Sequence, residues 1–321
     1  MSRTRAYRKG VLEDENFPVS QVSEHLDVAD TIVWVDLCAP SADELHELAA
    51  ELGLHELAVE DALESHQRPK LDHYPTHLFL SCHMVELRDG ELIVHEIDAF
   101  INQRWLITVR KSEGCDIDSI VARWDQSPDL ATYGVPYFLY GLLDVVADSY
   151  FDVVESFDTY YESVSDSLFA DQPIDPSGQR NRFEMRQALV KVYRLVTGLR
   201  EAVGSLLRRE KGVIPTVLDP YFQDVYDHIL RASDSIDTLR DLAASVVETN
   251  LALRDFRQNQ ITKKVTSWAA IIAVPTLITG YYGMNVRYPG LNTTWGFVVS
   301  VVLLLGCSLS LYMVFKRKGW L

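Results

Sequence analysis

A polar stripe runs along the last long helical segment of the chain, and its side chains suit the attraction and passage of cations. Its members recur at steps of three and four residues, which places them on one face of a helix. Acidic and hydroxyl residues give way to alanine and glycine along it. Carboxylate rings select cations and small residues leave room for an ion, so the stripe predicts a pore lining built from several copies. Close helix packing is the alternative, because small residues also let membrane helices approach. The stripe comprises Asp224, Asp227, Arg231, Asp234, Thr238, Asp241, Ser245, Glu248, Ala252, Asp255, Asn259, Thr262, Thr266, Ala269, Ala273, Thr276, Gly280 and Gly283.

Two uncharged apolar runs, 267–282 and 291–315, predict membrane spans in the last fifth of the chain. A span needs about 20 apolar residues, and the first run reaches this length only with its flanking residues. Lysine and arginine lie before the first span and after the second, with Arg287 alone between them. Because cytoplasmic flanks carry the Lys/Arg excess, we expect both termini in the cytoplasm and a multi-pass protein of the plasma or inner membrane.

Composition limits the remaining function classes. The 321 residues carry a formal net charge of -16, which argues against a nucleic-acid partner because such partners need a basic face. The four cysteines lie far apart without a CxxC pair, so buried free thiols in a cytosolic setting are expected. The basic N-terminus lacks an apolar core and does not predict a secretory signal. Neither GxxxxGK[ST] nor GxSxG occurs, so we expect no enzyme.

The elements that would position the stripe form an α+β domain followed by long helices. Strands are predicted at 31–37, 77–87, 91–102 and 105–111, with a hairpin turn at Asp89-Gly90. Helices are predicted at 41–52, capped by Ser41 and Glu44, and at 55–65. A helical hairpin follows, with breaks at 170–178 and 211–220. A helix from Pro220 to Tyr282 would be about 95 Å long and would carry an apolar seam opposite the stripe. That seam comprises Phe222, Val225, Ile229, Ala232, Ile236, Leu239, Ala243 and Val246.

We therefore divide the chain into an α+β cytosolic domain, a long α-helical stalk and two C-terminal transmembrane helices. The predicted segments are the α/β domain 1–130, helical hairpin 131–214, stalk 215–266, first span 267–285, external loop 286–294, second span 295–315 and basic tail 316–321.

The four histidines near the predicted sheet suggest a second kind of metal site. His66, His73, His77 and His83 could bind zinc if the fold brought them together. Surface or packing histidines are the simpler interpretation, because His73 and His77 flank a proline in a predicted turn.

Several stretches resemble the CorA family of divalent-cation transporters, over nearly the whole chain. They are "VWVDL", "ELGLHELAVEDALESHQRPKLDHY", "LITVRK", "YFQDVYDHI", "GYYGMN" and the ending "FKRKGWL". The resemblance implies a funnel-shaped homopentamer whose first spans line the pore, with Gly283, Met284 and Asn285 as the selectivity filter at its external mouth. Amide and carbonyl oxygens there would hydrogen-bond the waters of Mg²⁺, which dehydrates reluctantly. A helix C-cap is the other role open to Asn285.

The same resemblance assigns the remaining candidate sites. Asp61 and Asp224 match a regulatory metal pair between neighbouring subunits, with Glu60 and Asp227 as helpers; the residues alone would make Asp61 an ordinary exposed acid. Thr276 and Gly280 match pore positions, and Asn259 and Glu248 match polar and acidic rings. With the stripe, the predicted pore lining comprises Gly280, Thr276, Ala273, Ala269, Thr266, Val265, Thr262, Asn259 and Glu248.

The loop after the filter departs from the family pattern. Arg287 replaces negative charge, and Gly290 stands where relatives often have glutamate, so we expect weaker cation attraction. The loop also leans toward the zinc-transporting ZntB branch. Thr262 and Ala273 occupy places where some relatives have bulky apolar residues, and Val265 alone keeps apolar character.

The leading hypothesis is transport of Mg²⁺, with Co²⁺ and Ni²⁺ as further candidates, gated by cytosolic Mg²⁺. The membrane potential would drive it, since two charges gain about 4.6 kcal/mol per 100 mV. Proton-coupled Zn²⁺ transport is the alternative, and a membrane-anchored coiled-coil scaffold is the third. The expected partners are further copies of the chain, lipid and divalent ions, with no organic cofactor.

Overall fold

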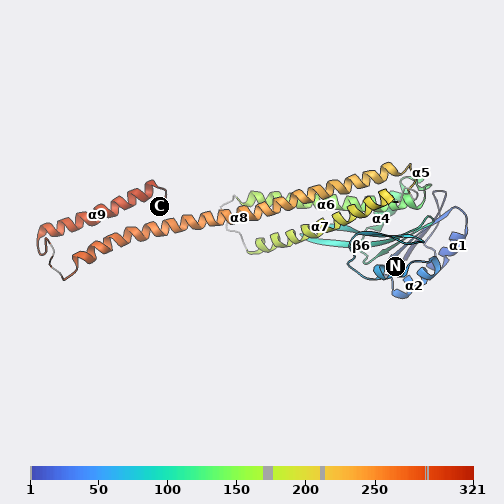
Figure 1. Ribbon diagram of the computed structural model, residues 1–321, viewed down its shortest axis with the longest axis horizontal. Coiled ribbons are helices and arrows are strands. Elements are labelled where there is room, and N and C mark those ends of the chain that lie inside the picture. The colour runs from blue at the N-terminus through green and yellow to red at the C-terminus, as the bar shows by residue number, and fades with distance from the viewer. Residues whose placement is uncertain (1, 169–175, 210–213, 286, 288) are drawn as a thin grey trace. The chain divides into compact units, whose positions relative to one another are not determined.

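The computed structural model of the protein (Figure 1) describes residues 2–168, 176–209, 214–285, 287 and 289–321. It forms two compact units, Met1–Ala244 and Ser245–Leu321. The long helix α8, Asp219–Tyr282, begins in the first unit and ends in the second.

A seven-stranded mixed sheet forms the centre of the first unit, in the order β2-β1-β3-β7-β6-β5-β4. Strands β3 and β7 are parallel, and the other neighbouring pairs are antiparallel. The two long strands β5 and β6 are joined at Asp89 and Gly90, whose φ angles are 53° and 82°. This left-handed pair suits a tight hairpin and confirms the predicted turn. The strands are β1 Ser2–Arg8, β2 Val11–Glu15, β3 Thr31–Cys38, β4 Lys70–His73, β5 Leu78–Arg88, β6 Glu91–Ile101 and β7 Trp105–Arg110.

Helices cover both faces of this sheet. Because side chains along each strand point alternately to opposite faces, one strand contributes to the cores on both sides. On β3, Val33 and Val35 belong to a core with the short N-terminal helices, whereas Trp34 belongs to a core with the later ones. Figure 1 shows α1 and α2 on one side of the sheet and α4, α6 and α7 on the other. The shorter helices are α1 Val22–Asp27, α2 Ala42–Leu52, α3 Glu56–Leu63, α4 Ile117–Asp125 and α5 Pro128–Ala131.

The predicted capping box sets the start of α2, and the predicted helical hairpin follows later in the chain. Ser41 caps α2 through a capping box, accepting from the Glu44 backbone N–H at 3.2 Å while Glu44 accepts from the Ser41 backbone at 2.8 Å. The helical hairpin consists of α6, Val135–Leu168, and α7, Pro176–Arg209, which contact each other. Helix α7 begins inside the predicted break, of which 169–175 lies outside the described residues. Residues 211–213 of the second predicted break lie outside them as well.

Helix α8 carries the predicted apolar seam as a buried face. Its members from Phe222 to Ala243 join the core that includes α6 and α7, and Val246 is buried too. Pro275 lies inside the helix without ending it. Helix α9, Thr294–Arg317, follows the connecting loop. Cys38, Cys82 and Cys115 are buried free thiols, and Cys307 is half-buried.

A buried ion pair locks the parallel strands together. The Arg110 guanidinium on β7 contacts both Asp36 carboxylate oxygens on β3, at 2.6–3.0 Å, and both residues are buried. Asp36→Ala is expected to lower the free energy of unfolding by about 3–5 kcal/mol, because it leaves Arg110 buried without a counter-charge. Urea denaturation of the full chain in detergent measures this. The double variant Asp36→Leu/Arg110→Met should recover most of the loss, and an unchanged single variant would contradict the prediction.

Candidate functional site

The polar stripe is solvent-exposed along its whole length on α8, from Asp224 to Gly283. Up to Val246 this exposure contrasts with the buried seam on the opposite face. Beyond Val246 large apolar side chains are exposed as well, including Ile272 at 63% and Leu277 at 74%. Val265, a predicted pore-lining residue, is 63% exposed. Exposure therefore separates the two faces only in the first half of the helix.

Two helices, α8 and α9, are long and apolar enough to cross a membrane. Their most apolar windows are 6% and 0% buried. Such an uncovered apolar surface is not stable in water and needs lipid or further copies of the chain. The predicted spans thus coincide with the apolar part of α8 and with α9.

The C-terminal end of α9 lies beside the predicted pore face within the second unit. Gly319 has a φ of 67°, and the Trp320 ring stacks on Phe315 with centroids 5.7 Å apart. Trp320 and the predicted pore residues Asn259, Thr262 and Thr266 border a hollow of about 330 Å³. The sequence does not predict this hollow, since it depends on how the two spans lie together.

A tight turn ends α8 at the predicted filter. The backbone N–H of Gly283 donates to the Thr279 carbonyl at 2.8 Å, and that of Met284 donates to the Tyr281 carbonyl at 3.3 Å. A Cβ atom at Gly283 would lie 3.0 Å from the Thr279 oxygen, which is tighter than ordinary contacts, so glycine suits this turn. Gly283, Met284 and Asn285 are all exposed. Of the predicted loop 286–294, residues 286 and 288 lie outside the described residues.

Two glycines set the geometry of the connecting loop. Gly290 has a φ of 93°, in the left-handed region that L side chains rarely adopt. A Cβ atom at Gly296, in the first turn of α9, would overlap the Gly290 carbonyl oxygen. A glutamate at position 290 would therefore be strained, which gives a physical reason for the missing acid.

Asp61 lies on α3 and is paired within its own chain. Its carboxylate contacts Lys70 Nζ at 2.6 Å, at the start of β4. Lys70 also lies 3.1 Å from Asp72. The neighbouring Glu60 is exposed. Asp61 and Asp224 belong to elements on opposite faces of the sheet, because α3 packs into the core that contains Val33 and α8 packs into the core that contains Trp34.

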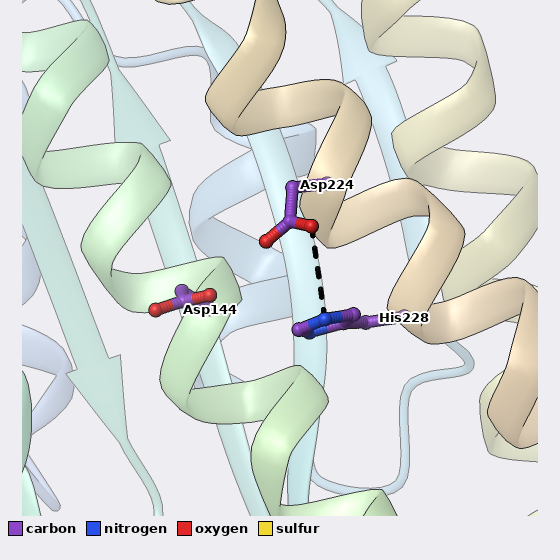
Figure 2. A group of neighbouring side chains, drawn as sticks. All are labelled: Asp144, Asp224 and His228. Carbon is purple, nitrogen blue, oxygen red and sulfur yellow. Dashed lines mark ion pairs between the residues drawn. The ribbon is translucent and has the colours of Figure 1, made fainter.

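Asp224 instead belongs to a group on two helices (Figure 2). Asp224 and His228 on α8 face Asp144 on α6, with one ligand atom of each within 4.8 Å of the others. His228 Nε2 lies 3.8 Å from Asp224 Oδ1. Within the described part of the chain, this is the one group of three or more His, Cys, Asp or Glu side chains arranged for a metal ion. Asp227 stands outside it and accepts from Gln223 Nε2 at 3.1 Å.

The two carboxylates of this group could bind a metal ion, but the positively charged Arg123 already lies beside them. Burial raises the pKa of the Asp144 carboxyl, which the nearby Arg123 guanidinium opposes. Arg123 contacts Asp144 and lies 2.9 Å from Asp148. Two carboxylates suit Mg²⁺, which prefers oxygen and keeps several waters, whereas an imidazole suits Zn²⁺, Co²⁺ or Ni²⁺.

Sequence reasoning missed Asp144 and His228, although each leaves a signal. Asp144 is a single acid in the apolar run "YFLYGLLDVVA", and it is buried in the structure. An isolated acid on a buried helix face requires a partner. His228 lies one helical turn after Asp224, so the two side chains share a face.

The histidines proposed for zinc do not converge, since no group of three of them is found among the described residues. His77 packs against Tyr74, Phe100 and Trp105, and burial lowers its pKa to about 4. His83 is buried near Glu96, and burial lowers its pKa to about 4 as well. Both are packing histidines.

Fold and site together define a membrane protein with a mixed-sheet domain, an acid-bearing long helix and two uncovered apolar helices. The chain belongs to the family of CorA-like Mg²⁺ transporter proteins, whose model matches residues 29–317. The cobalt/magnesium transport protein CorA of Thermotoga maritima is 27% identical over 316 residues, covering 96% of this chain and 90% of the relative. The magnesium transport protein CorA of Haemophilus influenzae is 22% identical and covers 91% of this chain and 93% of the relative.

Solved structures share the whole fold. The complete CorA magnesium transporter from Methanocaldococcus jannaschii aligns with a TM-score of 0.80 at 22% identity, covering 99% of this chain and 98% of that one. Full-length CmaX aligns with a TM-score of 0.72 at 19% identity, over 99% and 97% of the two chains. The expected family and fold class are confirmed. The relatives are named as transporters, in agreement with the expectation of a transporter rather than an enzyme.

Proposed function

We propose that the protein conducts Mg²⁺ across the membrane as a homopentamer, with Co²⁺ and Ni²⁺ as further permeant ions. Its termini lie in the cytoplasm, and the apolar part of α8 lines the pore. Family membership supports divalent-cation transport. The observation that carries the pore assignment is that α8 continues without interruption from an acidic face at Asp224 to the turn at Gly283. An oligomer is needed because two helices cannot enclose a path, and both present uncovered apolar surface.

Asn285 acts in this proposal as the filter for a hydrated ion. It follows the turn at Gly283 and is exposed at the end of α8. A ring of amide oxygens can accept hydrogen bonds from the waters of Mg²⁺, and its lack of charge lets the ion leave again. The two carboxylates Asp61 and Asp224 sense Mg²⁺ by bridging neighbouring subunits in the closed state. The exposure of Asp224 and the placement of the two acids on opposite faces of the sheet within one chain support a bridge between copies.

Flux through the purified protein in proteoliposomes tests the transport proposal. Uptake of Mg²⁺, Co²⁺, Ni²⁺ and Zn²⁺ would be compared under a membrane potential, with and without a pH gradient. The expected result is Mg²⁺ uptake that follows the potential and ignores the pH gradient. Zn²⁺ uptake that requires the gradient, without Mg²⁺ flux, would favour the zinc alternative. Absence of all flux, with the protein folded and inserted, would favour the scaffold.

A further inference from the structure

Lys70 occupies the position beside Asp61 that a bound cation would take. Its Nζ atom lies 2.6 Å from Asp61 Oδ2 and 3.1 Å from Asp72 Oδ2. It also lies over the Phe79 ring, 5.7 Å from the centroid. The Lys70 and Asp61 side chains are only 21% and 24% exposed. The ammonium of Lys70 thus lies between two carboxylates.

The backbone on the lysine side of this pair is held in place. Lys70 is the first residue of β4 and pairs with Ser81 on β5. The preceding Pro69 is buried against α7, where a Cβ atom at Gly198 would lie 3.1 Å from the proline Cβ. The backbone of Lys70 is therefore fixed. The residue loses less conformational entropy on pairing with Asp61 than a surface lysine in a loop would.

The helix that carries Asp61 is anchored as well. Lys111 Nζ contacts the carbonyl of Ala62, the residue after Asp61, and forms an ion pair at 3.0 Å with Asp98, which is fully buried. Burial raises the pKa of Asp98 to about 6, and the charge of Lys111 opposes that shift. The end of α3 is thus tied to β6 and to the residue after β7. Both members of the Asp61–Lys70 pair stand on fixed backbone.

We propose that Lys70 is a tethered competitor of the divalent ion at Asp61, so that it sets the Mg²⁺ concentration at which the sensor fills. This inference rests on the sensor role proposed for Asp61. A divalent ion on Asp61 would repel the nearby ammonium, so binding requires Lys70 to leave. Asp72 offers the released amine a second carboxylate without any movement of the backbone. The Lys70 side chain would then have two positions. At low Mg²⁺ the amine contacts both Asp61 and Asp72, and at high Mg²⁺ it contacts Asp72 alone.

Substitutions at Lys70 and at Asp72 are expected to shift the Mg²⁺ midpoint in opposite directions in one assay. Lys70→Met removes the competitor and should lower the midpoint of Mg²⁺ protection from protease about two- to fivefold, the range for ion pairs of modest exposure. Asp72→Asn removes the second partner and should raise the midpoint. Lys70→Arg keeps the charge and should stay near the wild type. Arg68→Met is the matched control. Arg68 lies two residues before Lys70 and is exposed, so this variant also removes one positive charge.

Limited proteolysis of the full chain in detergent, across a Mg²⁺ titration, gives these midpoints. Equal midpoints for Lys70→Met and Arg68→Met would overturn the competitor role while leaving the sensor intact. Absence of Mg²⁺ protection in the wild type would instead overturn the sensor and the competitor together. Thermal unfolding without Mg²⁺ checks that each variant folds. If Lys70→Met does not fold, the Asp72→Asn variant tests the competitor role, and a midpoint that is not raised would overturn it.

Discussion

Asn285→Ala is expected to lower Mg²⁺ flux at least about tenfold, because a hydrogen bond to a charged group contributes about 1.5–3 kcal/mol and every copy in the ring loses one. The fold should survive, since the backbone amides of Gly283 and Met284 rather than the Asn285 side chain close the end of α8. Flux into proteoliposomes under a fixed membrane potential measures the effect. Asn285→Asp should conduct poorly for the opposite reason, since a ring of carboxylates holds the ion too tightly to release it.

The matched control for this prediction is Asn292→Gly in the connecting loop. Asn292 has a φ of 61°, so glycine keeps its left-handed backbone while an amide is removed near the same membrane face. The control should conduct like the wild type. Wild-type flux in Asn285→Ala would refute the filter role.

Asp224→Ala should raise the Mg²⁺ concentration needed for protection from protease at least about tenfold, because a carboxylate ligand to Mg²⁺ is lost without replacement. Proteolysis of the full chain across a Mg²⁺ titration measures the midpoint. Asp234→Ala is the matched control, since Asp234 is an exposed acid on the same face of α8 and belongs to no metal-binding group of described residues. Equal midpoints in Asp224→Ala and the wild type would contradict the sensor assignment.

Two further variants separate the bridge between subunits from the group inside one chain. Asp61→Asn removes the proposed partner in the neighbouring subunit, whereas His228→Gln changes only the group with Asp144. If the ion bridges two subunits, Asp61→Asn should match Asp224→Ala, and His228→Gln should remain close to the wild type. The reverse result would place the regulatory ion between α6 and α8 of a single chain. In that case His228 predicts a preference for Co²⁺, Ni²⁺ or Zn²⁺ over Mg²⁺.

Features governed by neighbours in the chain could be predicted from the sequence. The capping box at Ser41, the hairpin at Asp89-Gly90 and the buried seam of α8 each depend on residues within a few turns. Their physical causes are helix capping, left-handed turn conformations and the period of the helix. The resemblance then supplied the family and the fold class, which the comparisons confirm.

The arrangement around the acids could not be predicted in the same way. Lys70 follows Asp61 by nine residues, and their contact depends on how α3 packs beside β4. Asp144 and Asp224 lie on helices separated by α7, so only the packed bundle brings them together. The pore requires copies of the chain beyond the one described, so its lining stays a prediction.

The turn at Gly290 limits how the loop between the two spans can acquire charge. Replacing that glycine with glutamate would add an acid at the cost of backbone strain, and the crowded Gly296 leaves the turn no space to relax. Leu291, which is 40% exposed, is the more suitable place for a new carboxylate. An engineered variant with a stronger cation-attracting mouth should therefore carry the acid at position 291 instead of position 290.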